Sequence, residues 1–394
     1  MKKQITILLA LTAITLSSCG TTQGNLHQVL SSEWNTFSQS RKDFSGGLAM
    51  QIISPKGDYF VSTGMGIYTS NKQHFRTASC TKTFTGAAIM LLNQQGKLNI
   101  DDKLTDNIPG TDTPYLPATS TFNIPYKDQI TIRMVLMHRA GIFDVSNQAL
   151  PGTVPAPYTG VSYINYIEEQ DPNHQFTFDE LIGVDATYQI SNFVPDTKYQ
   201  YSNTGYSVLG KIVERVTGQT YADFVTAQLI VPNKLFDSVM VVDSNEQSLP
   251  VPYADGYAWD GTNSTNVTLS NMSPHVAEGN LTTTPKDLAT WIYKLLRSEA
   301  GLNSTTVDMM KNGSATGTGT STYGLSISHT DLNGYGHSGA HAGYLTIMFY
   351  HPETDVAYVM FTNGWDYSNG QTSILAQIDY MTATANKVLA KLGY

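Results

Sequence analysis

Three residues with potentially nucleophilic side chains, Ser79, Cys80 and Thr81, stand next to one another in this sequence, and Lys82 follows directly. A serine hydroxyl is a weak nucleophile that needs a base nearby, and a lysine can be that base when burial lowers its pKa. If a helix begins at Ser79, the Lys82 amine shares a face with the Ser79 hydroxyl, whereas Cys80 points about 100° away. We therefore predict Ser79 as a nucleophile with Lys82 as its base. The alternative is that Ser79 or Thr77 only caps the helix.

The element that carries this pair is predicted to be a buried helix. From Ser79 to about Gln95 the sequence is apolar nearly all round, and Gly96 follows. Such a pattern is typical of a helix inside a protein, because a surface helix keeps one polar face. Four strand-like runs accompany it, two before the helix and two near the end of the chain: 47–54, 58–63, 345–350 and 355–362.

Strand-like runs thus lie towards both ends of the chain, with helices and irregular stretches between them. We expect an α+β fold in which one antiparallel sheet, built from residues 26–96 and 288–394, is flanked by helices. A mostly helical region, 97–287, lies beside it. Two Pro- and Tyr-rich segments, 111–128 and 147–175, are long loops of the kind that often carries function.

Two further kinds of short motif recur along the chain. Tyr-x-Asn begins at Tyr163, Tyr201 and Tyr367. The triplet at Tyr201 directly precedes a predicted helix, whereas the one at Tyr163 lies in a loop. A basic residue two positions before a glycine occurs at Lys311, His337, His341 and Lys391, and the first and last of these are typical of helix ends.

Ser-x-x-Lys at the head of a buried helix after two strands resembles the penicillin-recognising serine hydrolases. This family includes class C β-lactamases, D-Ala-D-Ala carboxypeptidases and related esterases and D-aminopeptidases. Its members carry Tyr-x-Asn and then Lys/His-x-Gly, and the triplets at Tyr201 and His337 have the matching order and flanks. Asp196 departs from the family, which usually has glycine there. The resemblance covers roughly residues 25–394 and implies a β-lactamase/DD-peptidase-like fold.

The resemblance also implies a role for each motif residue. Ser79 attacks a carbonyl carbon and forms an acyl-enzyme, while Lys82 and Tyr201 share the acid–base work. Which of those two holds the proton at rest stays open. The remaining implied roles are positioning of Lys82 and substrate by Asn203, a weak pH-dependent positive centre at His337, backbone oxyanion donors at Ser79 and Ala340, and substrate contacts at Ser338 and Gly339.

The implied activity is that of a serine hydrolase, first a D-Ala-D-Ala carboxypeptidase acting on peptidoglycan-type peptides. An esterase, a D-aminopeptidase or a weak β-lactamase is the alternative, because His337 replaces the lysine of efficient β-lactamases and Ala340 has no hydroxyl to hold a terminal carboxylate. Substrates would be small peptides, amides or esters, with β-lactams as covalent ligands. A non-catalytic lipoprotein that binds penicillin or peptidoglycan is the alternative from another class.

The first residues are typical of an export signal. Two lysines precede an apolar run too short to span a membrane, which ends in Leu-Ser-Ser-Cys at Cys19. This ending resembles the bacterial lipobox, so we expect a signal peptide at 1–19, lipidation of Cys19, a tether at 20–25 and one catalytic module at 26–394. The protein would be an exported lipoprotein anchored to a membrane of the cell envelope and facing the periplasm or exterior. An ordinary signal peptide cut nearby is the alternative.

Composition limits the remaining classes of function. The chain has 394 residues and a formal net charge of −9, and no basic run interrupts it. This charge argues against nucleic acid as a partner, since phosphate binding needs clustered lysine and arginine. The histidines lack metal-ligand spacing, and we expect neither a metal nor a cofactor. If Cys19 is lipidated, Cys80 has no partner for an intramolecular disulfide.

Overall fold

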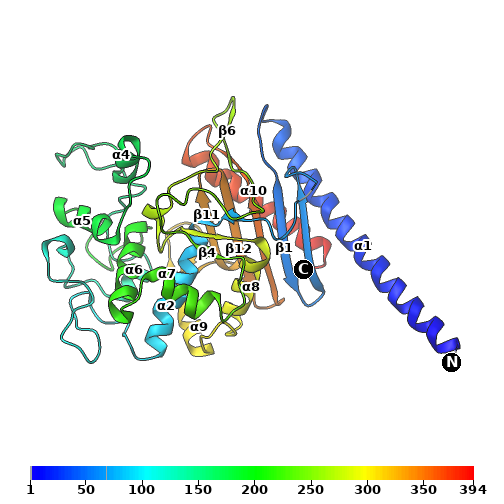
Figure 1. The fold of residues 1–394 in the computed structure, drawn as a ribbon, viewed down its shortest axis with the longest axis horizontal. Helices are drawn as coiled ribbons and strands as arrows, with labels where there is room; N and C mark the ends of the chain where they lie inside the picture. Colours follow the sequence, from blue (N-terminus) through cyan, green and yellow to red (C-terminus); the bar gives the residue numbers. More distant parts are fainter. Residues whose placement is uncertain (1, 68) are drawn as a thin grey trace.

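In a computed structural model, the chain forms a sheet region and a helical region that lie side by side (Figure 1). The structure describes residues 2–67 and 69–394, with side chains from residue 21 onward. The predicted signal segment 1–19 and Cys19 therefore lie outside the residues whose side chains are described. The predicted α+β architecture is confirmed, and residues 20–25, which we expected to be a tether, belong to the first helix.

The central element is an eight-stranded antiparallel sheet built from both ends of the chain. The four strand-like runs identified in the sequence are four of its strands. In spatial order the strands are β2 (Gly57–Thr63), β1 (Leu48–Ser54), β13 (Val356–Thr362), β12 (Tyr344–His351), β11 (Gly334–His341), β10 (Ser328–Thr330), β9 (Thr322–Tyr323) and β8 (Ser314–Ala315).

Two small sheets contain the other strands of the described residues. One consists of β14 (Gly364–Asp366), β5 (Tyr257–Trp259) and β6 (Ser264–Asn266), and the other of β3 (Phe75–Arg76), β7 (Leu281–Thr283) and β4 (Val239–Met240). The second sheet ties the residues just before Ser79 to the segment around residue 281, because Arg76 pairs with Thr282.

The helices are distributed over both faces of the sheet and the neighbouring region. The α-helices are α1 (Lys2–Gln39), α2 (Lys82–Gln94), α3 (Ile132–Leu136), α4 (Tyr163–Gln170), α5 (Phe178–Tyr188), α6 (Asn203–Thr217), α7 (Tyr221–Val225), α8 (Pro285–Leu296), α9 (Ser304–Lys311) and α10 (Gln371–Lys391). Short turns of 3₁₀ helix are η1 (Ala78–Thr81), η2 (Ser120–Phe122) and η4 (Ser273–His275), and η3 (Thr226–Ile230) is a turn of π helix.

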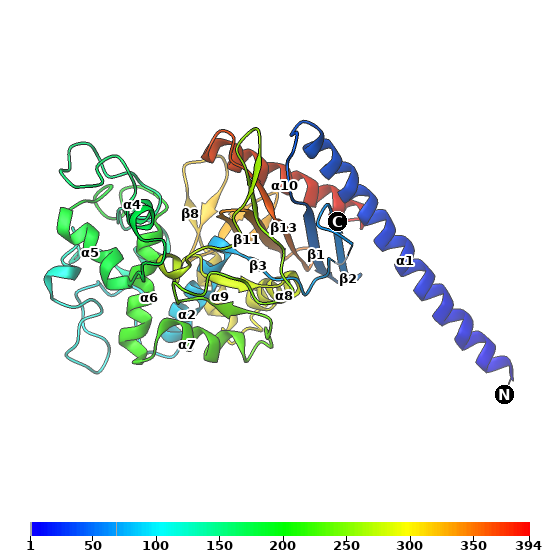
Figure 2. The ribbon, with the colours of Figure 1, turned by 45° about the horizontal axis from the view of Figure 1, so that its top comes forward.

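Helices cover the sheet on both faces because its central strands are apolar on both. Met50 and its cross-strand partner Met360 face a core shared with α1 and α10, whereas Ala49 and its partner Phe361 face the core that includes α2 and α8. Successive residues of a strand point to opposite faces, so one apolar run supplies two cores. Figure 2 shows α10 and the sheet-facing end of α1 on the same side of the sheet.

Helix α2 lies where the sheet region meets the helical region. It packs against α6 and α7 as well as α9 and β11. Eleven of its 13 residues are buried, as its all-round apolar sequence predicts. Its first residue, Lys82, is therefore held between the two regions.

The two long segments of the sequence have different structures. Segment 111–128 is irregular apart from η2, as predicted. Segment 147–175 contains α4, which we did not predict. Its residues Leu150, Tyr158 and Ile164 pack into a small separate core with α5.

Candidate active site

Ser79 lies in the 3₁₀ turn η1, one turn before Lys82 opens α2. The Lys82 amine (Nζ) is 3.2 Å from the Ser79 hydroxyl oxygen (Oγ), as the spacing predicts. Neither Thr77 nor Thr81 makes a side-chain capping bond, and the Thr77 hydroxyl instead donates to the carbonyl of Leu281. The alternative in which Ser79 or Thr77 caps the helix is therefore wrong. Ala78, just before Ser79, has φ +49°, a conformation that costs a non-glycine residue energy and that often marks functional sites.

Lys82 is fully buried and surrounded by oxygen atoms. Its Nζ lies 2.7 Å from the Asn203 side-chain oxygen, 2.9 Å from the Glu278 carbonyl oxygen and 3.1 Å from the Glu278 carboxylate. Burial lowers the pKa of Lys82, and Glu278 opposes that shift. A lysine with a lowered pKa is more easily converted to the neutral amine that a base requires.

Glu278 is a site residue that we did not predict. Its side chain is 5% exposed, and while one carboxylate oxygen contacts Lys82 the other lies 2.6 Å from Nδ1 of His275. Burial alone would raise the pKa of Glu278, but Lys82 and His275 lower it below its usual value. Burial would likewise lower the pKa of His275, but Glu278 raises it above its usual value. The three groups thus form a buried row, Lys82–Glu278–His275.

Tyr201 and Asn203 are positioned by the start of α6. The Ser202 hydroxyl accepts from the Gly205 amide and caps the helix, and Asn203 is the first helical residue. Burial raises the pKa of the Tyr201 phenol well above its usual value, and a hydrogen bond with Ser79 lowers it in part. The phenol is therefore protonated at neutral pH. Its ring centroid lies 4.9 Å from the Lys82 amine.

Asp144 is a second buried carboxylate that sequence reasoning missed. It is 2% exposed and accepts from the amides of Ser146 and Asn147 and, at the start of α6, from the amide of Asn203. Burial raises its pKa. Asp144 thereby helps to fix Asn203, which in turn holds Lys82.

The third motif lies on β11, whose backbone runs directly against η1. A side-chain carbon at Gly339 would be 2.2 Å from the Thr77 carbonyl oxygen and 3.0 Å from the Ser79 amide nitrogen, so only glycine fits. β10 pairs only with residues 334–336 of β11. The part of β11 that carries the motif therefore has no strand beside it on this edge and lies against η1 instead. Ala340 follows Gly339 and is exposed, and Ser338 is partly buried.

His337 differs from our expectation of a pH-dependent positive centre. It is 4% exposed, and burial together with Lys82 lowers its pKa to about 3. The imidazole is therefore neutral at working pH. Because a carbonyl can only accept, Nδ1–H donates to the Ser338 carbonyl, and Nε2 accepts from the Tyr323 hydroxyl at 2.9 Å.

Comparison with known proteins identifies the family. A model of the Beta-lactamase family matches residues 53–378. The chain belongs to this family. Penicillin-binding protein 4* of Bacillus subtilis (strain 168) is 28% identical over 186 residues, which are 47% of this chain and 35% of that protein. The chain thus spans about a third of the length of the curated relatives that it matches first.

Solved structures share the fold of this family member. A D-stereospecific amidohydrolase from Streptomyces sp. superposes with a TM-score of 0.71 at 20% identity, covering 90% of this chain and 97% of that one. The D-amino acid amidase from Ochrobactrum anthropi SV3, complexed with D-phenylalanine, has a TM-score of 0.72 at 19% identity, covering 95% and 99%. At these identities the likeness concerns the fold.

The other motif candidates lie elsewhere in this family member. Tyr163 is in α4, where its hydroxyl donates to Glu180 at 2.7 Å, and Tyr367 is 52% exposed beyond β14. Lys311 and Lys391 end α9 and α10. His341 lies beside the site, with its ring centroid 5.3 Å from that of His275 and its Nε2 3.0 Å from the Ser270 hydroxyl.

Sequence signals for the missed residues were present but weak. Two further segments of the sequence, 130–142 and 279–291, also resemble the family. His275 and Glu278 stand three apart just before the second segment, and Asp144 lies just after the first. A single acidic residue in a loop carries no periodicity or spacing that separates it from a solvated one. Only its contacts identify it.

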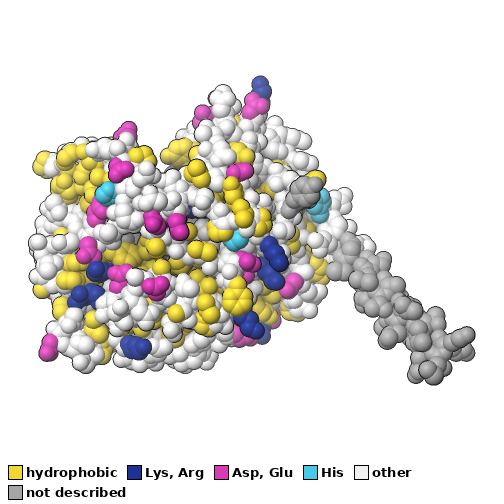
Figure 3. All heavy atoms as spheres, viewed as in Figure 1, with side chains coloured by type: hydrophobic (Ala, Val, Ile, Leu, Met, Phe, Trp, Pro, Cys, Tyr) yellow, Lys and Arg dark blue, Asp and Glu magenta, His cyan; other side chains and the backbone are white. Residues whose placement is uncertain are grey.

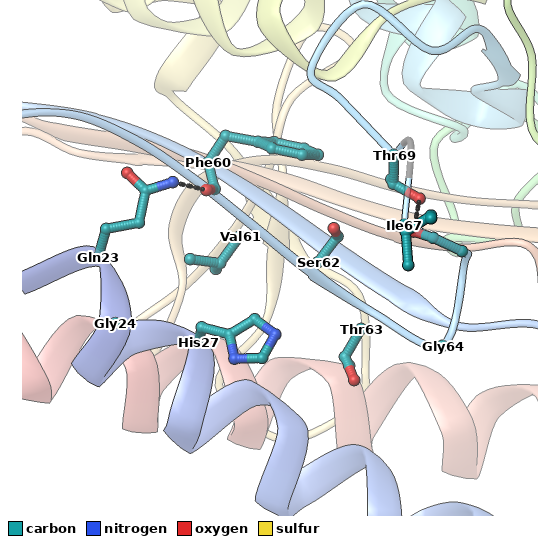
Figure 4. A pocket seen from close by; sticks show the side chains of 11 residues that line it. Gln23, Gly24, His27, Phe60, Val61, Ser62, Thr63, Gly64, Ile67 and Thr69 are labelled. Carbon is teal, nitrogen blue, oxygen red and sulfur yellow. Dashed lines mark hydrogen bonds between the residues drawn. The ribbon is translucent and has the colours of Figure 1, made fainter. Parts of the chain in front are cut away.

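Neither of two pockets in the described part of the chain is lined by Ser79 or Lys82. The larger, about 590 Å³, is a groove between α1 and β2. Figure 4 shows Gln23 and His27 on one side and Val61 and Thr63 on the other, with the Gln23 amide donating to the Phe60 carbonyl. The smaller is lined by His138 and Ser202, next to Tyr201 in sequence.

Neither the surface charge nor the metal-ligating side chains indicate a second kind of site. On the face drawn in Figure 3, acidic and basic side chains are dispersed and form no basic patch. Among the residues with described side chains, no three or more His, Cys, Asp or Glu are grouped to hold a metal ion. Over the same residues, no helix has both the length and the apolar character needed to cross a bilayer.

Proposed function

We propose that this chain is a serine amidohydrolase that works through an acyl-enzyme on Ser79. The observation that carries the proposal is the contact of the buried Lys82 amine with the Ser79 hydroxyl at 3.2 Å, with Asn203 fixing the amine from the other side. A nucleophile with a base in reach and a third group that orients the base is the arrangement that activates a serine. A binding protein without catalysis has no need for a buried amine at this position.

The surrounding residues supply the remaining parts of acyl transfer. Ser79 attacks the substrate carbonyl, and its proton passes to Lys82. The developing oxyanion is held by the backbone amides of Ser79 and Ala340, as the family resemblance implies, and the close approach of Gly339 to Ser79 supports this pairing. Tyr201, a protonated phenol, donates to the leaving group and is reprotonated by Lys82. Water then hydrolyses the acyl-enzyme.

Among amide substrates, we infer that D-aminoacyl amides and short peptides are preferred over peptides ending in D-Ala-D-Ala. A carboxypeptidase must hold the terminal carboxylate of its substrate, which favours a cation or a hydroxyl. His337 is neutral and Ala340 has no hydroxyl, which leaves the Ser338 hydroxyl in this stretch. The D-amino acid amidase whose fold this chain shares was solved with D-phenylalanine and with L-phenylalanine amide, so the amides of phenylalanine are the first compounds to test.

The test is labelling with a fluorescent fluorophosphonate and a fluorescent penicillin, followed by hydrolysis of D-phenylalanine amide, a D-Ala-D-Ala peptide and p-nitrophenyl esters. We expect labelling of the wild type, none of Ser79→Ala, and labelling slowed by about 100-fold or more in Lys82→Ala. Equal labelling of Ser79→Ala would contradict the proposal, and an unlabelled, folded wild type would favour the non-catalytic lipoprotein.

Lys82→Ala needs a stability measurement beside its kinetics. It leaves the Glu278 carboxylate buried without its lysine partner, and breaking a buried ion pair typically costs roughly 3–5 kcal/mol. Thermal unfolding therefore accompanies each rate. A slow variant that is still folded at the assay temperature supports the role of Lys82 as base.

A further inference from the structure

The surroundings of Lys82 raise the question of where its own proton goes. A lysine ammonium has three hydrogens and no lone pair, so it can accept the Ser79 proton only after losing one of its own. Four oxygen atoms lie within 3.2 Å of its Nζ: those of Ser79, the Asn203 amide, the Glu278 carbonyl and the Glu278 carboxylate. The amide and carbonyl oxygens do not hold a proton at ordinary pH, and Ser79 is the group to be deprotonated. Only the Glu278 carboxylate remains.

We propose that Glu278 takes a proton from Lys82 and so produces the free amine that deprotonates Ser79. This inference rests on the proposed function and extends it to the proton path of the same site. Glu278 does not touch the substrate in this scheme, so it is a positioning residue that acts through Lys82.

The protons and electrons balance over the acylation half-reaction. Lys82 Nζ transfers a proton to the carboxylate of Glu278, and the resulting amine takes the Ser79 proton as the Oγ–C bond forms and the carbonyl electrons move onto the oxyanion. When the oxyanion collapses, the C–N bond breaks and the leaving amine receives a proton from Tyr201. Lys82 then gives a proton to the Tyr201 phenolate. Glu278 then returns its proton to Lys82, and the ion pair is restored.

The second oxygen of Glu278 connects this path to His275. Its contact with His275 Nδ1, at 2.6 Å, holds the carboxylate in place while the other oxygen faces Lys82. The charged and titratable groups that face the row from neighbouring elements include Asp144, Glu168 on α4, Tyr201 and Tyr206 at α6, His138 after α3, His337 and His341 on β11, and Cys80 on η1.

The pH profile follows from the position of the proton. In the wild type the ion pair of Lys82 and Glu278 keeps one proton between them, so activity is lost on the acid side only when Glu278 itself is protonated. Lys82 and His275 lower the pKa of Glu278. The acid limb of the wild type therefore lies below about 4.3, the usual pKa of a glutamate. Without the carboxylate, Lys82 must release its proton to solvent, and the limb then follows the pKa of Lys82, which burial lowers and which no longer has Glu278 to raise it.

The experiment measures the second-order rate of fluorophosphonate labelling from pH 3 to 10 for the wild type, Glu278→Gln and Glu278→Asp, so that the range includes the acid limb expected for the wild type. We expect the acid limb of Glu278→Gln to move up by about one pH unit or more, with labelling near pH 6 reduced about tenfold or more and recovering at alkaline pH. Glu278→Asp keeps a carboxylate, so its limb stays where the wild type has it even if its rate is lower.

Controls separate this inference from the proposed function and from a merely structural role. Glu353→Gln, at an exposed glutamate in the turn between β12 and β13, leaves the profile unchanged. If the wild type is labelled and its acid limb is the same as that of Glu278→Gln, the inference is overturned and the proposed function stands. If Glu278→Gln does not fold, the comparison rests on Glu278→Asp. An acid limb of Glu278→Asp at a different pH from that of the wild type then overturns the inference. No Ser79-dependent labelling of the wild type overturns the proposed function itself.

Discussion

Cys80 is the intrinsically better nucleophile of the pair Ser79–Cys80, yet its surroundings make it inert. Its thiol is fully buried and directed at the His337 carbonyl at 3.5 Å, and burial raises its pKa. The thiolate is the reactive form of cysteine, so a raised pKa suppresses attack. Ser79, one residue earlier, has a hydroxyl that faces Lys82.

Replacing Cys80 tests this assignment. We expect Cys80→Ala to retain fluorophosphonate labelling within about threefold of the wild type and to lose about 1 kcal/mol of stability, because a small buried side chain is truncated. The measurement is labelling rate together with thermal unfolding. A Cys80→Ala variant that folds but is as inactive as Ser79→Ala would show that the nucleophile was assigned wrongly.

At the scale of elements, the site depends on β11 lying directly against η1. Gly339 permits this contact, because any side chain there meets the Thr77 carbonyl. Thr81 adds a second tie, since its hydroxyl accepts from the Leu281 amide and donates to the Ala78 carbonyl. The turn that carries Ser79 is therefore clamped between β11 and β7.

Gly339→Ala probes this clamp. The added methyl group forces β11 away from η1 and displaces the Ala340 amide, so we expect labelling to slow by about 100-fold, the typical effect of losing one oxyanion donor. Overpacking of this kind typically also costs about 1–3 kcal/mol of stability. Gly152→Ala is the matched control, because no atom lies within 4 Å of a side-chain carbon built there. Wild-type labelling by Gly339→Ala would contradict the assignment of Ala340.

At the scale of the whole molecule, attachment to a membrane through a lipid on Cys19 stays a proposal that rests on the sequence of residues 1–19. We propose that Cys19 is lipidated after export, so that the catalytic module is attached to a membrane of the cell envelope. In cells fed a palmitate analogue with a clickable alkyne, we expect the full chain to be labelled and Cys19→Ala to be unlabelled and released from the membrane fraction. Equal lipid labelling of Cys19→Ala would contradict the lipobox interpretation.

The sequence by itself determined four strands of the central sheet, the buried helix α2 and the pairing of Ser79 with Lys82. These depend on short-range regularities, namely the period of apolar residues and a separation of three positions along one helix. Motif order then selected Tyr201 and His337 from several rivals. Each of these inferences needs only neighbours in the sequence or a family pattern.

Only the tertiary structure decided the electrostatics of the site. Glu278 reaches Lys82 across 196 positions of sequence, and no local pattern distinguishes it from a solvated acid. His337 has the right place in the motif, yet its burial makes it neutral where we expected a positive centre. Protonation depends on desolvation and on charges brought together by folding, so the residue types are readable from the sequence while their charge states are properties of the packed site.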